Sequence, residues 1–351
     1  MEDNDLPSSP IYSIITPTFN RAHTLYRVYE SLKRQSVNDF EWIVIDDGST
    51  DNTPNLLKRL QQDVKFSMTW CRYTNNRGRN AAVNAGIRLV SGQYTIILDS
   101  DDELFDEAIE KISYWVSKTK IERDETTFAL LFRCIDQNGS MVGEVPKMTQ
   151  NLFSDDILTV SKRDGRCRLG LDVEVLCVAK SKIFKQFCFV ELTDHEHCQE
   201  AITYNEICSV YNSIYVNEAL RKYWRFDGDC LSDGASSGIK WPRGNYLWGL
   251  SVLNKDIQYF QFDRKQYFNC ARKITRLGLL IGRPLNQQYR DLTNRLARLI
   301  WFLVIWRGLL GYTRDRLLGT KIPRANPDIT EWGPADLPEN WEIHSTVITN
   351  K

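Results

Sequence analysis

The sequence lacks an excess of either charge, because 45 lysines and arginines balance 45 aspartates and glutamates in 351 residues. A dedicated nucleic-acid surface needs clustered positive charge, so this balance argues against nucleic acid as a partner. The nine cysteines lack any CxxC pair and are scattered singly. That pattern is typical of reduced thiols in a cytosolic protein and argues against a disulfide framework or a zinc site.

The first residues also lack the basic start and the apolar run of a secretory signal, since Met1 to Asp5 is acidic and polar. We therefore expect a cytoplasmic protein whose residues 1–10 form a disordered lead. A chain of 351 residues is long enough for two or three domains and a sizeable core.

One stretch is dense in acids. Residues Tyr94–Leu98 form a short run rich in branched apolar residues, which predicts a buried strand, and four carboxylates follow within five positions, at Asp99, Asp101, Asp102 and Glu103. Their mutual repulsion favours a cationic partner, and a divalent metal that grips a diphosphate would supply one. The competing interpretation is a solvated acidic loop that opens the next helix.

Strands and helices are expected to alternate through the first hundred residues. The predicted strands are Tyr12–Thr16, Phe40–Ile45, Met68–Tyr73 and Tyr94–Leu98, and the predicted helices are 22–36, 53–62 and 81–90. Alternation of this kind predicts a doubly wound, mostly parallel α/β sheet, in which the polar strand ends gather around one crevice.

Four motifs stand at the ends of these elements. They are Pro17–Arg21 (PTFNR), Val44–Asp51 (VIDDGSTD), Asn76–Gly86 (NRGRNAAVNAG) and Leu98–Asp102 (LDSDD). In order and spacing, over residues 11–105, they resemble the family 2 glycosyltransferases. The resemblance implies a GT-A fold and the inverting transfer of a sugar from a nucleotide diphosphate.

The resemblance also implies roles for single residues. Pro17 and Thr18 would border the nucleotide, and Asp47 would hydrogen-bond the base edge, commonly uracil, so a UDP-sugar is the favoured donor. Arg79 stands where the family often places a cation near the nucleotide; the alternative is a surface arginine at a helix start.

Asp99 and Asp101 form the DxD pair, which would hold Mn or Mg, with Asp101 favoured as the direct ligand and Asp102 as the alternative. A fixed divalent cation stabilises the charge that builds up on a departing diphosphate.

The candidate general base is Glu200. The segment from Cys198 to Ile207 resembles the family segment in which an acidic residue opens a helix below the sugar, although this chain has Glu-Ala where many members have Glu-Asp. Inversion needs a carboxylate that takes the proton of the acceptor hydroxyl. Asp194 and Glu196 are rivals for this role, and Glu200 could instead cap its own helix or pair with a lysine.

His195, Glu196, His197 and Cys198 have spacing that could place several metal ligands together. No second cluster of histidine or cysteine completes a tetrahedral site in the sequence, so an exposed loop is the favoured interpretation.

Beyond the donor-binding half we expect residues 106–230 to form the acceptor-binding half of the same GT-A domain. Residues 231–320 are expected to form a lid and a C-terminal helical region, and residues 321–351 an extended tail. Leu299–Trp306 is an apolar run of eight residues between two arginines, too short to span a membrane. The segment 296–312 could make peripheral contact with the inner face of the cell membrane, pack as a buried helix or form an oligomer contact.

Three functions remain in competition at this point. The leading hypothesis is a metal-assisted inverting glycosyltransferase that acts on a hydroxyl of a glycan or a lipid-linked acceptor. A nucleotidyltransferase that makes sugar nucleotides is the second, but the chain lacks that class's usual glycine-rich phosphate loop. A non-catalytic glycan-binding scaffold of the same fold is the third.

Overall fold

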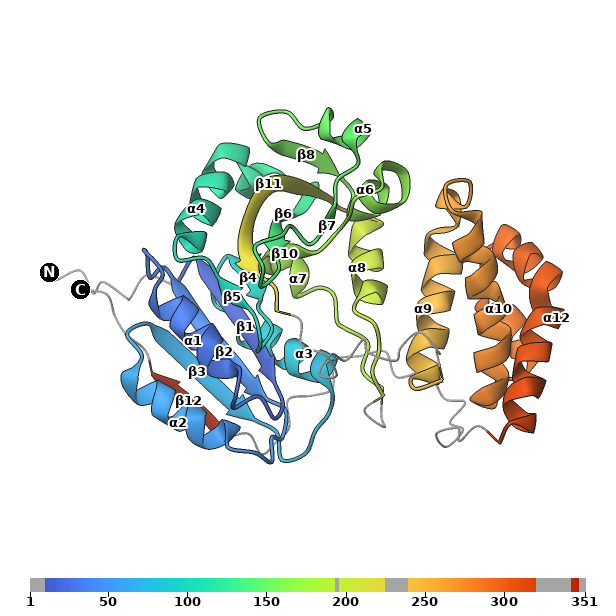
Figure 1. Ribbon diagram of the computed structural model, residues 1–351, viewed down its shortest axis with the longest axis horizontal. Coiled ribbons are helices and arrows are strands. Elements are labelled where there is room, and N and C mark those ends of the chain that lie inside the picture. Colours follow the sequence, from blue (N-terminus) through green and yellow to red (C-terminus); the bar gives the residue numbers. More distant parts are fainter. Residues whose placement is uncertain (1–9, 193–195, 225–238, 320–341, 347–351) are drawn as a thin grey trace, which may run out of the picture.

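The computed structural model describes residues 10–192, 196–224, 239–319 and 342–346 (Figure 1). The strands are β1 Tyr12–Thr18, β2 Phe40–Asp46, β3 Ser67–Arg72, β4 Tyr94–Ile97, β5 Glu103–Leu104, β6 Thr127–Ile135, β7 Gly143–Glu144, β8 Ile157–Val160, β9 Asp172–Val173, β10 Val175–Lys180, β11 Asn212–Lys222 and β12 Glu342–Thr346. The helices are α1 Leu25–Lys33, α2 Thr53–Asp63, α3 Arg79–Leu89, α4 Ala108–Thr119, α5 Lys147–Gln150, α6 Lys162–Leu169, α7 Ser181–Phe184, α8 Ala201–Cys208, α9 Pro242–Lys255, α10 Arg264–Leu280, α11 Leu285–Asp291 and α12 Arg295–Leu317.

One large mixed sheet runs through the first part of the molecule. Its strand order is β12-β3-β2-β1-β4-β10-β6-β11-β5, with β8 paired to β11. The first-half strands β3, β2, β1 and β4 are parallel to one another, while β10 and β12 are antiparallel to their neighbours. The predicted doubly wound, mostly parallel sheet is therefore confirmed, and the carboxyl ends of β1, β2 and β4 share one edge.

Each central strand is buried on both faces, because alternate residues point into different helical layers. On β1, Ile14 packs in the core that includes α1, α2 and α4, whereas Ile15 packs in the core that includes α3, α7 and α8. On β2, Val44 and Ile45 divide between the same two cores. Two helical layers thus fix the sheet rigidly, which holds its strand ends in place.

No feature of the sequence predicted the last described strand, β12. The segment 321–351 was expected to be an extended tail; most of it lies outside the described residues, but 342–346 pairs antiparallel with β3 at the sheet edge. The His344 ring stacks on Trp70 at 4.2 Å between centroids. This strand therefore covers an edge that would otherwise expose unpaired backbone groups. Residues 1–9 and 225–238, expected to be a lead and part of a lid, are also outside the described part.

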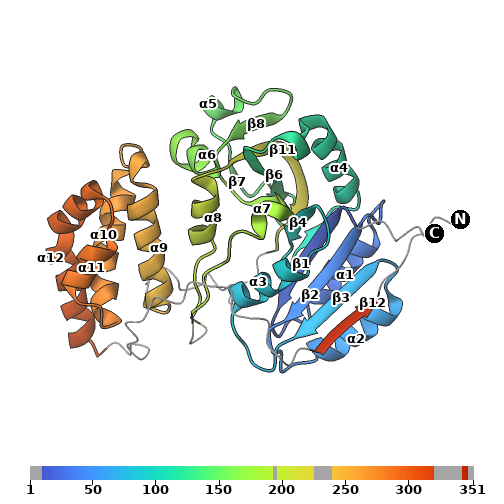
Figure 2. The ribbon, with the colours of Figure 1, turned by 180° about the vertical axis from the view of Figure 1, so that it is seen from behind.

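A separate core lies among α9, α10 and α12, to one side of the sheet in both views (Figures 1 and 2). Four residues of the sheet domain extend this core: Val190, Leu192, Cys198 and Ile202. Since Cys198 and Ile202 flank the candidate base, the helical region is packed directly against the segment that carries it. The apolar run predicted at 299–306 lies in α12, whose inner face is buried and whose outer face is exposed.

Gly86 allows helix α3 to pack closely on β1. A Cβ at this position would collide with the Ile15 side chain, which is fully buried. We predict that Gly86→Ala lowers the free energy of unfolding, because overpacking costs about 1–3 kcal/mol and the gain in helix propensity is only about 1 kcal/mol. Urea denaturation measures the change.

Gly311→Ala is the matched control. The new Cβ would lie 3.1 Å from Cδ of Arg276, an aliphatic carbon that would have to shift by only a few tenths of an ångström. This variant should be as stable as the parent or slightly more so. If Gly86→Ala behaved in the same way, the close contact between α3 and β1 would not be a constraint.

Candidate functional site

The loop after β2 is held by its own two aspartates. Asp46 is fully buried; its Oδ1 accepts the Ser49 backbone N–H at 2.9 Å, and its Oδ2 lies 3.2 Å from Nε of Arg72. Gly48 has φ of +77°, and a Cβ there would come within 2.7 Å of the Asn75 backbone. Asp46 therefore has a structural role, and only glycine fits the next turn.

Asp47 reaches across to the loop before α3. Its two oxygens accept the backbone N–H groups of Arg77 at 2.7 Å and Gly78 at 2.8 Å. Burial raises the pKa of Asp47 to about 7, although both hydrogen bonds favour the ionised form. Thr18 is adjacent, since its carbonyl accepts the Asp47 N–H at 2.8 Å. The Thr18 hydroxyl is buried without a hydrogen-bond partner among the described residues, so it is available to a ligand.

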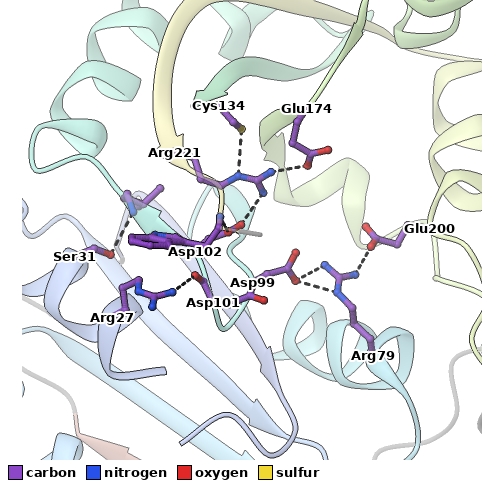
Figure 3. Close-up of polar contacts among 12 residues, drawn as sticks. Arg27, Ser31, Arg79, Asp99, Asp101, Asp102, Cys134, Glu174, Glu200 and Arg221 are labelled. Carbon is purple, nitrogen blue, oxygen red and sulfur yellow. Dashed lines mark hydrogen bonds and ion pairs between the residues drawn. The ribbon is translucent and has the colours of Figure 1, made fainter. Parts of the chain in front are cut away.

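Arg79 joins two distant parts of the chain (Figure 3). Its Nε and Nη2 donate to Oδ1 of Asp99 at 3.0 and 2.6 Å, and its Nη1 lies 2.5 Å from Oε1 of Glu200. The arginine follows directly after Gly78, whose N–H is held by Asp47. One continuous set of contacts thus links Asp47, which is predicted to bind the nucleotide base, with the DxD aspartate Asp99 and the predicted general base Glu200.

Charge balance explains why these groups tolerate burial. Desolvation opposes ionisation of Asp99, but the Arg79 guanidinium outweighs it and holds the pKa of Asp99 below its usual range. In turn, Asp99 and Glu200 raise the pKa of Arg79 despite its desolvation. The arrangement keeps the Arg79 cation and the Asp99 carboxylate ionised at the strand edge, which is the state that charged-ligand chemistry needs.

The three DxD-region acids have different surroundings. Asp102 is fully buried, 3.5 Å from Nη1 of Arg221, and accepts the Trp224 N–H at 3.1 Å. Asp101 is only partly buried, and its carbonyl accepts Nη1 of Arg27 at 2.9 Å. No cluster of three or more metal-ligating side chains exists among the described residues. A cation here would need ligand phosphates as well, which is how Mg²⁺ is commonly held beside one or two carboxylates.

Glu200 immediately precedes α8, at the N-cap position, yet its side chain makes no hydrogen bond that caps the helix. Its carboxylate faces Arg79 instead (Figure 3). The rival Glu196 is turned toward α9, where it accepts the N–H groups of Arg243 at 2.6 Å and Gly244 at 3.1 Å. Burial raises the pKa of Glu196 to about 7. This residue anchors the helical region, while the other rival, Asp194, lies outside the described residues.

Two asparagines in the third motif were not singled out by sequence reasoning. Asn80 donates to the carbonyls of Val190 and Cys198 at 2.8 and 3.0 Å. Asn84, one turn later, donates to the Phe189 carbonyl and accepts its N–H, both at 2.8 Å. Polar residues at i and i+4 on a helix of small apolar residues are the signal that could have identified them. They fix the segment that leads to Glu200.

Arg221 and Arg27 were also missed. Arg221 contacts Asp102, Glu174 and the Cys134 sulfur, and Arg27 lies over the Trp224 ring at 4.1 Å. Both residues sit in ordinary amphipathic patterns, so no local feature of the sequence distinguishes them. The expectation of an exposed loop at His195–Cys198 is wrong for the described residues 196–198: Cys198 is 2% exposed in the helical core, and the Glu196 side chain is buried against Arg243. Packing of α9 against this segment covers these side chains, and no group of three or more metal-ligating side chains exists in the described part of the chain.

Comparisons with known proteins find glycosyltransferases. Residues 13–121 match the family model described as glycosyl transferase family 2. A Campylobacter jejuni GalNAc(5)-diNAcBac-PP-undecaprenol β-1,3-glucosyltransferase is 27% identical over 75% of this chain and 80% of its own length. The Staphylococcus aureus poly(ribitol-phosphate) β-N-acetylglucosaminyltransferase TarP is 38% identical over 28% of this chain and 31% of its own.

Two solved structures share the fold. Residues 1–349 of S. aureus TarS, in complex with UDP-GlcNAc, superpose with a TM-score of 0.60 at 16% identity, covering 88% of this chain and 92% of that one. The mannosyltransferase PcManGT from Pyrobaculum calidifontis, in complex with GDP-Man and Mn²⁺, superposes with a TM-score of 0.50 at 15% identity. The match covers 90% of this chain and 89% of that one. The GT-A fold predicted from the sequence is confirmed.

The hydrogen bonds of Asn84 should have a measurable effect on stability. We predict that Asn84→Ala lowers the free energy of unfolding by about 1–3 kcal/mol, because it leaves the buried Phe189 backbone without partners. The exposed Asn55→Ala is the control and should change stability by less than about 0.5 kcal/mol. Equal effects of the two substitutions in urea denaturation would contradict the assignment.

Proposed function

We propose that this chain, a glycosyltransferase whose residues 13–121 match the family 2 model, is an inverting enzyme that uses a UDP-sugar. The acceptor would be a hydroxyl of a glycan or of a lipid-linked glycan, at the cytoplasmic face of a membrane. The C. jejuni relative is named for an undecaprenol-linked acceptor and the TarS complex holds UDP-GlcNAc, which supports both choices.

The observation that carries the proposal is the contact of Arg79 with both Asp99 and Glu200. It joins a donor-side carboxylate to a second carboxylate about one hundred residues later in the chain. In the proposed reaction the acceptor oxygen attacks the anomeric carbon, the bond from that carbon to the diphosphate breaks, and UDP leaves with the electron pair. Glu200 accepts the acceptor's proton, which an ionised carboxylate can do.

The other residues would hold the donor. Asp47, with Pro17 and Thr18 beside it, is suited to the base edge, and Arg79 to the charge of the diphosphate. Asp101, with Asp99 near it and Asp102 as the alternative, would hold Mn²⁺ or Mg²⁺, which would neutralise charge on the leaving diphosphate. The hard carboxylate oxygens at this strand end fit such a cation.

Glu200→Gln tests the proposed base. We predict that kcat for sugar transfer falls by about 10²–10⁴-fold while the KM for the donor changes little, because the amide cannot accept the proton. The assay measures UDP release with manganese present. Glu206→Gln lies on the same helix, where its side chain is 40% exposed and faces Lys255 instead of Arg79, and it should retain full activity.

Asp101→Ala separates donor binding from the base step. It should weaken manganese-dependent donor binding and abolish UDP release, whereas Glu200→Gln should still bind donor and metal. If Glu200→Gln kept its turnover, the base would have to be another residue. Formation of UTP and a sugar 1-phosphate when pyrophosphate is added to the UDP-sugar would identify a nucleotidyltransferase, and nucleotide binding without turnover would identify a scaffold.

The raised pKa of Asp47 predicts a pH dependence of donor affinity. Because this pKa is about 7, the carboxylate becomes protonated as pH falls, and a base N–H then loses its acceptor. We expect the Kd of a UDP-sugar to rise toward tenfold per unit as pH falls below about 7. The phosphates of the donor are diesters and do not titrate there.

Asp47→Asn should bind the donor more weakly and with a flat pH profile, since an amide does not titrate. Calorimetry at several pH values measures both curves. A parent protein whose donor affinity is constant between about pH 6 and pH 8 would contradict the proposed role of Asp47.

A further inference from the structure

The C-terminal helices are strongly basic, although the whole chain is neutral. Residues 264–318 contain twelve arginines and lysines and two aspartates, a net charge of +10. Both aspartates are already in ion pairs, Asp291 with Arg283 at 2.6 Å and Asp315 with Arg276 at 2.5 Å. The remaining basic side chains therefore give this end of the molecule a positive surface, which attracts anionic partners.

The same region exposes apolar side chains. Of the sixteen large apolar side chains that are exposed among the described residues, eight lie between 296 and 318. The most central are Phe302, Trp306 and Leu310, which are 70%, 52% and 60% exposed. A cluster of this kind, in place of single scattered residues, marks an interaction surface. We call it the outer face of α12; its residues are Leu296, Leu299, Phe302, Leu303, Trp306, Leu310 and Leu317.

Helix α12 cannot turn this face inward, because its opposite face is packed against α10. Ile300, Trp301 and Val304 are buried in the helical core, and Gly308 lies against Thr275 of α10. Figures 1 and 2 both place α12 at the end of the molecule, farthest from the sheet. The outer face is therefore directed away from the protein.

Arginines border the outer face on both sides. At 100° per residue, Arg307 and Arg314 lie on one side of the line through Trp306 and Leu310, and Arg298 and Arg316 lie on the other. The one acid of the helix, Asp315, is only 1% exposed. A central apolar stripe between rows of arginine is the pattern of helices that lie in the plane of a membrane interface.

Two other occupants explain the pattern less well. The apolar run of eight residues is too short to span a membrane, but the helix that contains it has 23 residues and by length and composition could cross one. However, one face of α12 packs on α10, and the buried Arg276–Asp315 pair lies at its end. A second copy docked face to face would bring the arginine rows of both chains together, with no exposed acid on either helix to offset them. An anionic lipid bilayer would bury the apolar stripe and attract the arginines to its headgroups.

We propose that the outer face of α12 docks in the plane of an anionic lipid bilayer, with Phe302 and Trp306 among its buried anchors and Arg307 and Arg314 at the headgroups. This inference goes beyond the proposed function and rests on the exposed apolar side chains of α12 and the positive charge of the C-terminal helices. A chain held in this way would meet lipid-linked molecules at the surface where they reside.

Vesicle flotation with the full chain tests the proposal. The protein should bind vesicles of phosphatidylcholine with about 30% phosphatidylglycerol, and only weakly those of phosphatidylcholine alone. Phe302→Ser with Trp306→Ser should weaken binding at least about tenfold. Arg307→Gln with Arg314→Gln should weaken it by about tenfold at low salt, and the difference should disappear at high salt.

Tyr26→Ser with Tyr114→Ser is the matched control, because these aromatic rings are 52% and 57% exposed on the sheet domain. It should bind vesicles like the parent. UDP release by the Phe302/Trp306 variant in the absence of vesicles should equal that of the parent, which separates this test from the proposed activity.

Three results would overturn the proposal. They are a parent chain that does not bind anionic vesicles, binding that resists alkaline carbonate extraction as a spanning helix does, and a parent dimer that the Phe302/Trp306 substitutions turn into a monomer. The last is measured by sedimentation velocity, and it would show that a second copy covers the outer face.

Discussion

The ion pairs of the Arg79 guanidinium unite the site. This side chain is only 14% exposed, and it contacts the carboxylates of Asp99, just beyond strand β4, and Glu200, just before α8, each of which is 35% exposed. One cation therefore offsets the repulsion between two acids that come from distant parts of the chain. The position of Arg79 is fixed through Gly78, whose N–H is bound by Asp47. The donor-side loops and the segment with the proposed base therefore cannot move apart without separating these ion pairs.

A second set of contacts brings the base segment to this arginine. Asn80 and Asn84 bind the backbone at residues 189–198, and Glu196 binds the N-terminus of α9. The C-terminal helices thus have two different sides: their inner side packs against the segment that carries the proposed base, and the outer face of α12 is exposed. The proposed activity and the proposed attachment to a lipid surface therefore both depend on the same helical core.

Local sequence signals predicted the first half of the fold well. Apolar strands that end in polar residues, as at Asp46–Asp51 and Asp99–Glu103, identify strand, edge and crevice together because parallel strands share one carboxyl edge. The motifs also gave the fold, which the solved structures confirm, and the family, whose model matches residues 13–121. The sequence predicted a role for Arg79 and a role for Glu200 separately, but it did not predict the contact between them.

The remainder depends on contacts between distant residues, which leave no local pattern. The pairing of β12 with β3, the Arg221–Asp102 pair and the turn of Glu196 toward α9 each join positions that are far apart in the chain. Paired acids can also have unequal roles: Asp46 closes its own turn, while Asp47 crosses to the next loop. Spacing cannot tell such roles apart, because they depend on where each carboxylate points.

The central claim is that these acids form one donor site. A crystal of the protein grown with a UDP-sugar and manganese, measured at the manganese absorption edge, tests it most directly. The account predicts an anomalous peak beside Asp101 and the uracil ring beside Asp47. It also predicts that Glu200 lies on the side of the anomeric carbon opposite the diphosphate. A manganese peak elsewhere, or a sugar bound away from Glu200, would contradict it.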